Sequence, residues 1–132
     1  MAKYFTKEHS KFLIKIHVIF CVKYRKKLLV RYGGVMKSIL LGVAARSDFL
    51  IEVLEVDQDH VHMLISYPPT LSVTSIVRRL KQMSTYSIWQ MYPNYLAKEF
   101  WKEHTFWSDG YFACSTGDAS TATVRKYIEQ QG

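Results

Sequence analysis

The run DHVHMLISY (59–67) constrains the fold of this chain more than any other part of its sequence. Side chains alternate between the two faces of a β-strand, and one face of this run is apolar, with Val61, Met63, Ile65 and Tyr67. The other face carries His60 and His62, about 6.5–7 Å apart along the strand. The run therefore predicts a strand that packs one face against a core and presents two imidazoles on the other.

The remaining segments predict an α+β fold. Alternation and helical periodicity indicate strands at 12–22, 49–56, 60–67 and 111–116, and helices at 33–48, 73–91 and 121–131. The order β-α-β-β-α-β, with an antiparallel sheet and an extra C-terminal helix, is ferredoxin-like. We expect residues 1–132 to form a single domain. The first and third strands are neighbours in such a sheet, so Lys15 and His17 are expected to share the open face with the histidine pair.

The charge of the chain predicts a polyanionic partner. Eighteen Lys and Arg residues oppose 11 Asp and Glu residues, a net charge of +7. Nucleic acid is the first candidate for such a partner, and an acidic membrane surface is the second. The basic residues gather in KYRKK (23–27) and RRLK (78–81), which favours a binding surface over evenly solvated charge.

The sequence also indicates a compartment. Its apolar run at 12–22 is too short for a transmembrane helix and lacks the cleavage site of a signal peptide. Cys21 and Cys114 are far apart and lie in apolar runs, so we expect free, buried thiols in a reducing cytoplasm.

The histidine pair has a structural interpretation and a chemical one. Imidazoles on a sheet surface often serve only as hydrogen-bonding groups, and two alone make a weak site for a divalent metal. A histidine-triad phosphohydrolase is excluded, because its third histidine would stand at Leu64. A third ligand is available in VRKYIEQQ (124–131), where Tyr127 and Gln131 lie one turn apart on one helix face. Taken alone, Tyr127 is better explained as a packing residue of a terminal helix.

Four segments in order carry a resemblance to a known family. They are HVIFCVKYRKKLL (17–29), HVH (60–62), WSDGYFACSTG (107–117) and YIEQQ (127–131). Together they resemble the HUH single-tyrosine transposases of small insertion sequences, the IS200-like or TnpA type. The similarity covers nearly the whole chain.

The resemblance implies an enzyme that acts on single-stranded DNA. By that likeness His60, His62 and Gln131 hold a divalent metal, Mg²⁺ or Mn²⁺, with Gln130 as a substitute for Gln131. Tyr127 is then the nucleophile that cleaves and rejoins DNA at insertion-sequence ends through a 5′-phosphotyrosine. A homodimer is also implied, with active sites shared between subunits. Gly117 would let the tyrosine helix leave its own sheet, whereas Asp118 would stiffen that link.

The resemblance also gives the basic clusters a role in binding DNA hairpins. The expected DNA-binding residues are Lys23, Tyr24, Arg25, Lys26, Lys27, Arg78, Arg79 and Lys81. Trp89, Trp101 and Trp107 are candidates for stacking on unpaired bases, but at least two of them are expected in the core.

Two other functions remain open at this point. A replication initiator or relaxase of the HUH class shares the chemistry, although such enzymes usually carry a third histidine on the strand. A non-enzymatic ferredoxin-like nucleic-acid-binding protein would carry aromatic side chains on the central strands, where this chain has histidines.

Overall fold

The fold places four strands in one sheet, with helices against it. The computed structural model describes residues 5–7, 10–12, 14–101, 103–115 and 121–130. The strands are β1 (Phe5–Lys7), β2 (Ser10–Phe12), β3 (Lys15–Cys21), β4 (Leu50–Val56), β5 (His60–Ser66) and β6 (Phe112–Ser115). The helices are α1 (Leu29–Ala45), α2 (Val73–Met91), α3 (Pro93–Phe100) and α4 (Thr121–Gln130), and Lys23–Arg25 forms a 3₁₀ turn.

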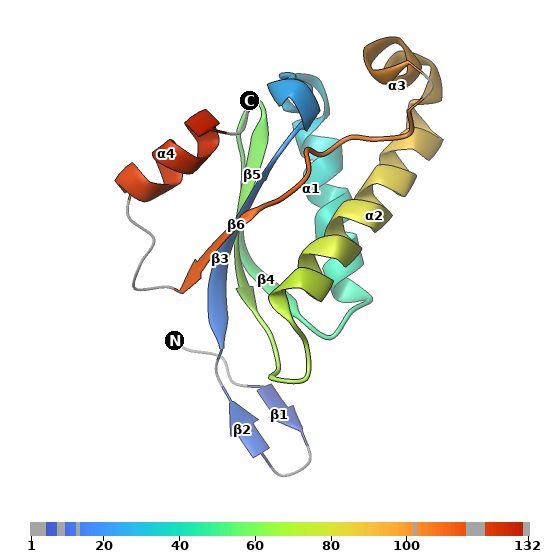
Figure 1. Ribbon diagram of the computed structural model, residues 1–132. Coiled ribbons are helices and arrows are strands. Elements are labelled where there is room, and N and C mark those ends of the chain that lie inside the picture. The colour runs from blue at the N-terminus through green and yellow to red at the C-terminus, as the bar shows by residue number, and fades with distance from the viewer. Residues whose placement is uncertain (1–4, 8–9, 13, 102, 116–120, 131–132) are drawn as a thin grey trace.

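The sheet has the strand order β4-β5-β3-β6, and every neighbouring pair is antiparallel. Helices α1 and α2 cover one face, and α4 lies on the other side of the sheet (Figure 1). This confirms the predicted α+β fold, with β3 and β5 as central neighbours. Across the described residues, every helix is too short or too polar to span a bilayer.

The core fills the space between the sheet and helices α1 and α2. Strand β5 contributes Val61, Met63 and Ile65, none of which has any exposed surface. These are the apolar residues that the alternation of the run predicted. The other strands and helices complete the core with, among others, Val18, Phe20, Met36, Leu40, Ile76, Leu80 and Ile88. Of the three tryptophans, Trp89 and Trp107 are buried and Trp101 is exposed. This confirms the expectation that at least two of them lie in the core.

The predicted start of the first helix was wrong. The expected helix at 33–48 begins four residues earlier, at Leu29, and ends at Ala45. Leu29 and Tyr32 are buried and extend its apolar face toward the N-terminus. Gly33, the first residue of the expected helix, lies inside α1, and a Cβ there would approach Val56 Cγ1 to 3.3 Å. The glycine thus permits close packing of α1 on β4 and does not mark a helix start.

Two further boundaries differ from the prediction. The expected strand at 12–22 is divided, because Ser10–Phe12 pairs with β1 in a separate hairpin and β3 spans Lys15–Cys21. The segment after α2 contains a helix beyond the three expected ones, α3, which begins at Pro93 and buries Leu96 and Phe100. Proline suits the first turn of a helix because a backbone N–H at that position would have no partner within the helix. By contrast, α2 spans the predicted 73–91, with the Ser72 hydroxyl accepting from the Ser75 N–H at 3.0 Å.

A buried serine links α2 to the segment that leads into β6. Ser84 is fully buried, and its Oγ accepts a hydrogen bond from Trp107 Nε1 at 2.9 Å. We predict that Ser84→Ala lowers the free energy of unfolding by about 1–3 kcal/mol, because it leaves the indole N–H buried without an acceptor. Chemical denaturation would measure the loss. Ser38→Ala, at an exposed position of α1, is the control and should stay within about 0.5 kcal/mol of the unaltered protein. Equal stability of the two variants would contradict the prediction.

Candidate active site

The open face of the sheet carries three histidines from its two central strands. The register pairs Ile19 with His62 and Cys21 with His60, which places His17, His60 and His62 on one face. His17 Nδ1 lies 2.9 Å from His62 Nε2, so the two rings share a hydrogen bond. Beside them is a small hollow of about 90 Å³, lined by His17, Val53, Glu55, His62 and Leu64. The predicted sharing of this face by His17 and the histidine pair is confirmed.

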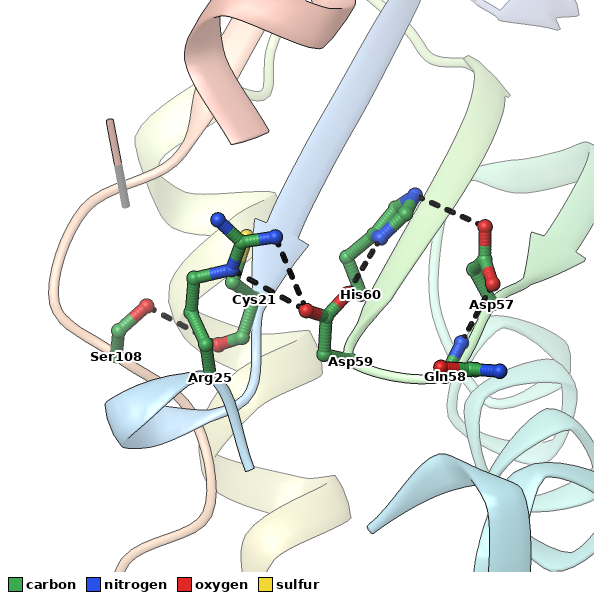
Figure 2. A network of polar contacts seen from close by, with 7 residues as sticks. All are labelled: Cys21, Arg25, Asp57, Gln58, Asp59, His60 and Ser108. Atoms are coloured by element: carbon green, nitrogen blue, oxygen red, sulfur yellow. Dashed lines mark hydrogen bonds and ion pairs between the residues drawn. The ribbon is translucent and has the colours of Figure 1, made fainter. Parts of the chain in front are cut away.

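His60 is held by the acidic turn that precedes β5. Its Nδ1 lies 2.9 Å from Asp59 Oδ1, and Asp59 Oδ2 accepts from Arg25 Nε at 3.2 Å (Figure 2). Burial alone would raise the pKa of the Asp59 carboxyl, but hydrogen bonds from His60 and Arg25 outweigh it and hold that pKa below its ordinary value. Asp59 is therefore ionised and fixes one nitrogen of the His60 ring.

The pKa of His62 is lowered. Burial is the main cause, and the neighbouring His17 adds to it, while Glu55 opposes it. A lowered pKa keeps the His62 imidazole neutral at neutral pH, and the neutral ring is the form that binds metals.

Tyr127 lies on α4, over the same face of the sheet. Its ring is 5.4 Å from that of Phe112 on β6. Phe112 pairs with Ile19, and Ile19 pairs with His62, so the three residues form one row across the sheet. Strands are about 4.8 Å apart, which puts the backbones of Phe112 and His62 roughly 10 Å apart. The tyrosine and the histidine pair are thus brought together on one face.

The phenol of Tyr127 is enclosed. Its oxygen is buried and has no hydrogen-bond partner among the described residues. Burial raises the pKa of Tyr127 above its usual value, and the Cys21 thiol on β3 contributes to the rise. The hydroxyl therefore keeps its proton at neutral pH. Beside the histidine face, it can still donate and accept hydrogen bonds.

The residues present fit a metal in part. Imidazole nitrogens suit divalent transition ions, and His60 and His62 offer two of them on one face. Within the described ranges, no group of three or more His, Cys, Asp or Glu side chains is arranged to hold a metal. Gln131 lies outside the described residues, as do Gly117 and Asp118, and Gln130 is exposed at the end of α4.

The basic turn at 23–27 is largely neutralised within the chain. Lys23 pairs with Glu103 at 2.5 Å, Arg25 with Asp59 at 3.1 Å and Lys26 with Glu99 at 3.0 Å. Two of the expected DNA-binding residues in this turn, Tyr24 and Lys27, are exposed. They are the side chains of the turn that face solvent most openly.

The second basic cluster, on α2, is also divided. Arg78 is exposed, and Arg79 donates to Ser47 Oγ at 2.6 Å. Lys81 donates to the carbonyl oxygens of Ser108 and Gly110, at 2.8 and 2.5 Å. Burial lowers the pKa of Lys81. Lys81 thus supports the segment before β6 in addition to any contact with DNA.

Sequence reasoning did not assign a role to Asp59, although its position directly before His60 was a usable signal. An acidic residue at the end of a turn lies within hydrogen-bonding reach of the first residue of the strand that follows. Arg25 gave no such signal, because its partner is 34 positions away.

Comparisons with known proteins identify the family of the chain. The profile of the family described as "Transposase IS200 like" matches residues 10–131. The chain is 33% identical over 119 residues to the ISDra2 transposase TnpA of Deinococcus radiodurans, covering 89% of this chain and 84% of that protein. It is 30% identical over 126 residues to the transposase for insertion sequence element IS200 of Salmonella typhimurium, covering 93% and 80%.

Solved structures give the same result. The crystal structure of a candidate transposase from Deinococcus radiodurans R1 superposes with a TM-score of 0.85 at 26% identity, and 96% of each chain is covered. A REP-associated tyrosine transposase bound to a REP hairpin shares the fold, with a TM-score of 0.57 at 15% identity over 94% of this chain and 69% of that one. The profile match and the two relatives at 30% identity or more show that this chain belongs to the IS200-like transposase family.

Proposed function

We propose that the chain cleaves and rejoins single-stranded DNA at insertion-sequence ends, with Tyr127 as the nucleophile. The observation that carries the proposal is the position of Tyr127 over the histidine face, with its hydroxyl buried and without a partner among the described residues. A packing tyrosine gains nothing from such a hydroxyl, since an unpaired buried polar group costs stability. A phosphate oxygen of bound DNA would supply the missing partner.

The proposed cleavage is a direct exchange of phosphate esters. Tyr127 Oη forms a bond to the scissile phosphorus, and the bond from phosphorus to the 3′ oxygen breaks. The phenol proton passes to a base or to water, and the departing 3′ oxygen takes up a proton. The product is a 5′-phosphotyrosine and a free 3′-OH, which reverses the step when it attacks the phosphotyrosine. One ester replaces another, so rejoining needs no ATP.

Burial raises the pKa of Tyr127 and so opposes loss of the phenol proton. A divalent metal at this site would neutralise charge on the phosphate and favour that loss. His60 and His62 would hold this ion together with an amide oxygen of Gln131 or Gln130. Mixed nitrogen and oxygen ligands suit Mn²⁺ better than Mg²⁺, which prefers oxygen alone.

Hairpin DNA is the proposed substrate. The net charge of +7 favours a polyanion. A protein of the same fold, the REP-associated tyrosine transposase, is bound to a hairpin. The exposed members of the predicted contacts are Tyr24 and Lys27 on the turn and Arg78 and Arg79 on α2.

A homodimer with shared active sites belongs to the same proposal. Within the described chain Tyr127 packs on its own sheet, beside Phe112. Exchange of the tyrosine helix between subunits would preserve those contacts, because an identical sheet would receive it.

Tyr127→Phe tests the nucleophile. We predict that this variant binds hairpin DNA as the unaltered protein does but forms no covalent adduct with single-stranded element ends, because only the phenolic oxygen is removed. Denaturing gel electrophoresis after incubation with Mn²⁺ would detect the adduct. Tyr86→Phe, which removes an exposed phenol from α2, should form the adduct normally. Adduct formation by Tyr127→Phe at the unaltered level would reassign the nucleophile.

The same variant has a predicted effect on stability. Because the removed hydroxyl is buried and unpaired among the described residues, Tyr127→Phe should leave the free energy of unfolding unchanged or raise it. A loss of more than about 1 kcal/mol would mean that the hydroxyl has a structural partner.

His62→Ala tests the metal site. We predict that it weakens Mn²⁺ binding by more than the roughly 10- to 100-fold expected for loss of an outer partner, and that it abolishes metal-dependent cleavage. Circular dichroism should show an intact fold, since His62 lies on the open face. His104→Ala, which removes an imidazole stacked on Trp89, is the control for loss of a histidine. Unfolding of His62→Ala alone would support a purely structural role for the histidine pair.

Mixing two inactive proteins tests the shared site. In dimers formed from His62→Ala and Tyr127→Phe, a shared arrangement gives one site with an intact tyrosine and an intact histidine pair, so cleavage returns. If each subunit uses its own tyrosine, every site carries a lesion. Zero activity, with subunit exchange verified independently by labelled subunits, would contradict sharing without affecting the chemistry.

A further inference from the structure

We propose that Arg25 and Asp59 are positioning residues that present His60 Nε2 for metal binding, and that Arg25 is not a DNA phosphate contact. The inference deepens the proposed function and rests on it for the metal. Its basis is the chain of contacts from the basic turn to β5 that Figure 2 shows.

Each oxygen of the Asp59 carboxylate has a separate partner. Oδ2 accepts from Arg25, with Nε at 3.2 Å and Nη2 at 3.1 Å. Oδ1 lies 2.9 Å from His60 Nδ1. An ionised carboxylate can only accept, so the proton of a neutral His60 must sit on Nδ1. The lone pair is then on Nε2.

The second ring nitrogen of His60, Nε2, makes no hydrogen bond to Asp57, the other acidic residue near it. Asp57 Oδ2 lies 3.9 Å from Nε2, too far for a hydrogen bond. A histidine that donates one N–H to a carboxylate and keeps the other nitrogen open has the arrangement commonly found around metal-bound imidazoles.

The backbone of the basic turn is shaped to bring Arg25 to Asp59. Tyr24 and Arg25 have φ values of 60° and 51°, in the left-handed region that non-glycine residues rarely adopt. The turn is fixed to its surroundings by the Arg25 N–H, which donates to Val22 O at 2.8 Å, and by the Val22 N–H, which donates to Asp59 O at 2.8 Å. Asp59 is therefore joined to the turn by backbone and side chain. Strained conformations of this kind persist where the surroundings enforce them, often at functional sites.

The side chains of the left-handed turn differ in their surroundings. Arg25 lies against Asp59, whose side chain is only 13% exposed, whereas Tyr24 is 63% exposed. Lys27, two residues beyond Arg25, is also exposed. The turn thus leaves Tyr24 and Lys27 exposed for DNA, while Arg25 holds the carboxylate that orients His60.

The experiment compares Arg25→Asn and Asp59→Ala with Lys27→Asn as the matched control. Asparagine tolerates the left-handed backbone, so Arg25→Asn removes the guanidinium without adding strain. The first readout is the ¹⁵N NMR spectrum of the His60 ring in the metal-free protein, assigned with His60→Gln. The unaltered protein should show a protonated Nδ1, and both test variants should show a mixture of the two tautomers.

The second readout is Mn²⁺ affinity by electron paramagnetic resonance, and the third is the salt dependence of hairpin binding. Both test variants should bind Mn²⁺ about 10- to 100-fold more weakly. Arg25→Asn should keep the salt slope of the unaltered protein, while Lys27→Asn should reduce that slope by about 1 and keep the Mn²⁺ affinity.

An unchanged tautomer and unchanged Mn²⁺ affinity in folded Arg25→Asn and Asp59→Ala would overturn the inference, as would a salt slope reduced by about 1 in Arg25→Asn. If a variant fails to fold, Asp59→Asn replaces it, because this change keeps the size of the side chain and removes its charge. The ¹⁵N NMR spectrum of the His60 ring in Asp59→Asn then tests the inference. Failure of the proposed function would look different, because the unaltered protein would then form no covalent adduct even though its His60 tautomer is as described.

Discussion

The antiparallel pairing of β3 with β5 is the constraint on which the rest of the structure depends. Its register puts Val18, Phe20 and Val61 into the core and leaves the histidines on the opposite face. A shift of one residue would exchange the two faces and bury the imidazoles in an apolar core. The hydrophobic pattern therefore fixes the position of the candidate site as firmly as it fixes the fold. The other edge of β3 pairs with β6, which carries Phe112, the residue on which Tyr127 of α4 packs.

Much of the positive charge in the basic turn is paired with acidic side chains and does not form a continuous basic surface. The net charge of +7 suggests a continuous basic surface. Yet much of the cationic turn at 23–27 is engaged with Glu103, Asp59 and Glu99. These pairs join the turn to α3, to the segment after α3 and to the residue before β5. The turn is thus held beside the histidine face, and its exposed members, Tyr24 and Lys27, form the surface proposed to contact DNA.

The sequence predicted the strands of the sheet and the face of the histidines because both follow from a period of two. It also predicted α2, because its apolar residues repeat at helical spacing and Ser72 caps it. The expected helix began at Gly33, whereas α1 begins at Leu29, because Leu29 and Tyr32 join its apolar face through packing on the core. The helix α3 was missed because its apolar face is short and rich in aromatic neighbours. Such features depend on packing, which local pattern does not contain.

Within the candidate site, the sequence indicated which residues to consider but not which of them contact one another. His60, His62 and Tyr127 were identified from the sequence, the tyrosine only through its family resemblance. The contact between His17 and His62, and the one between Arg25 and Asp59, join positions 45 and 34 residues apart. No local pattern indicates such pairs. The left-handed backbone at Arg25 is equally invisible, because arginine rarely adopts it.

The central claim is that Tyr127 becomes covalently attached to a DNA 5′ phosphate. Mass spectrometry of the purified protein tests it most directly, after reaction with single-stranded element ends and Mn²⁺ and digestion with nuclease and trypsin. Cleavage after Lys126 releases a peptide that begins with Tyr127. The account predicts a nucleotide joined through its 5′ phosphate to that tyrosine. A nucleotide on Tyr111 or any other residue, a 3′ linkage, or hairpin binding with no covalent adduct would contradict the account.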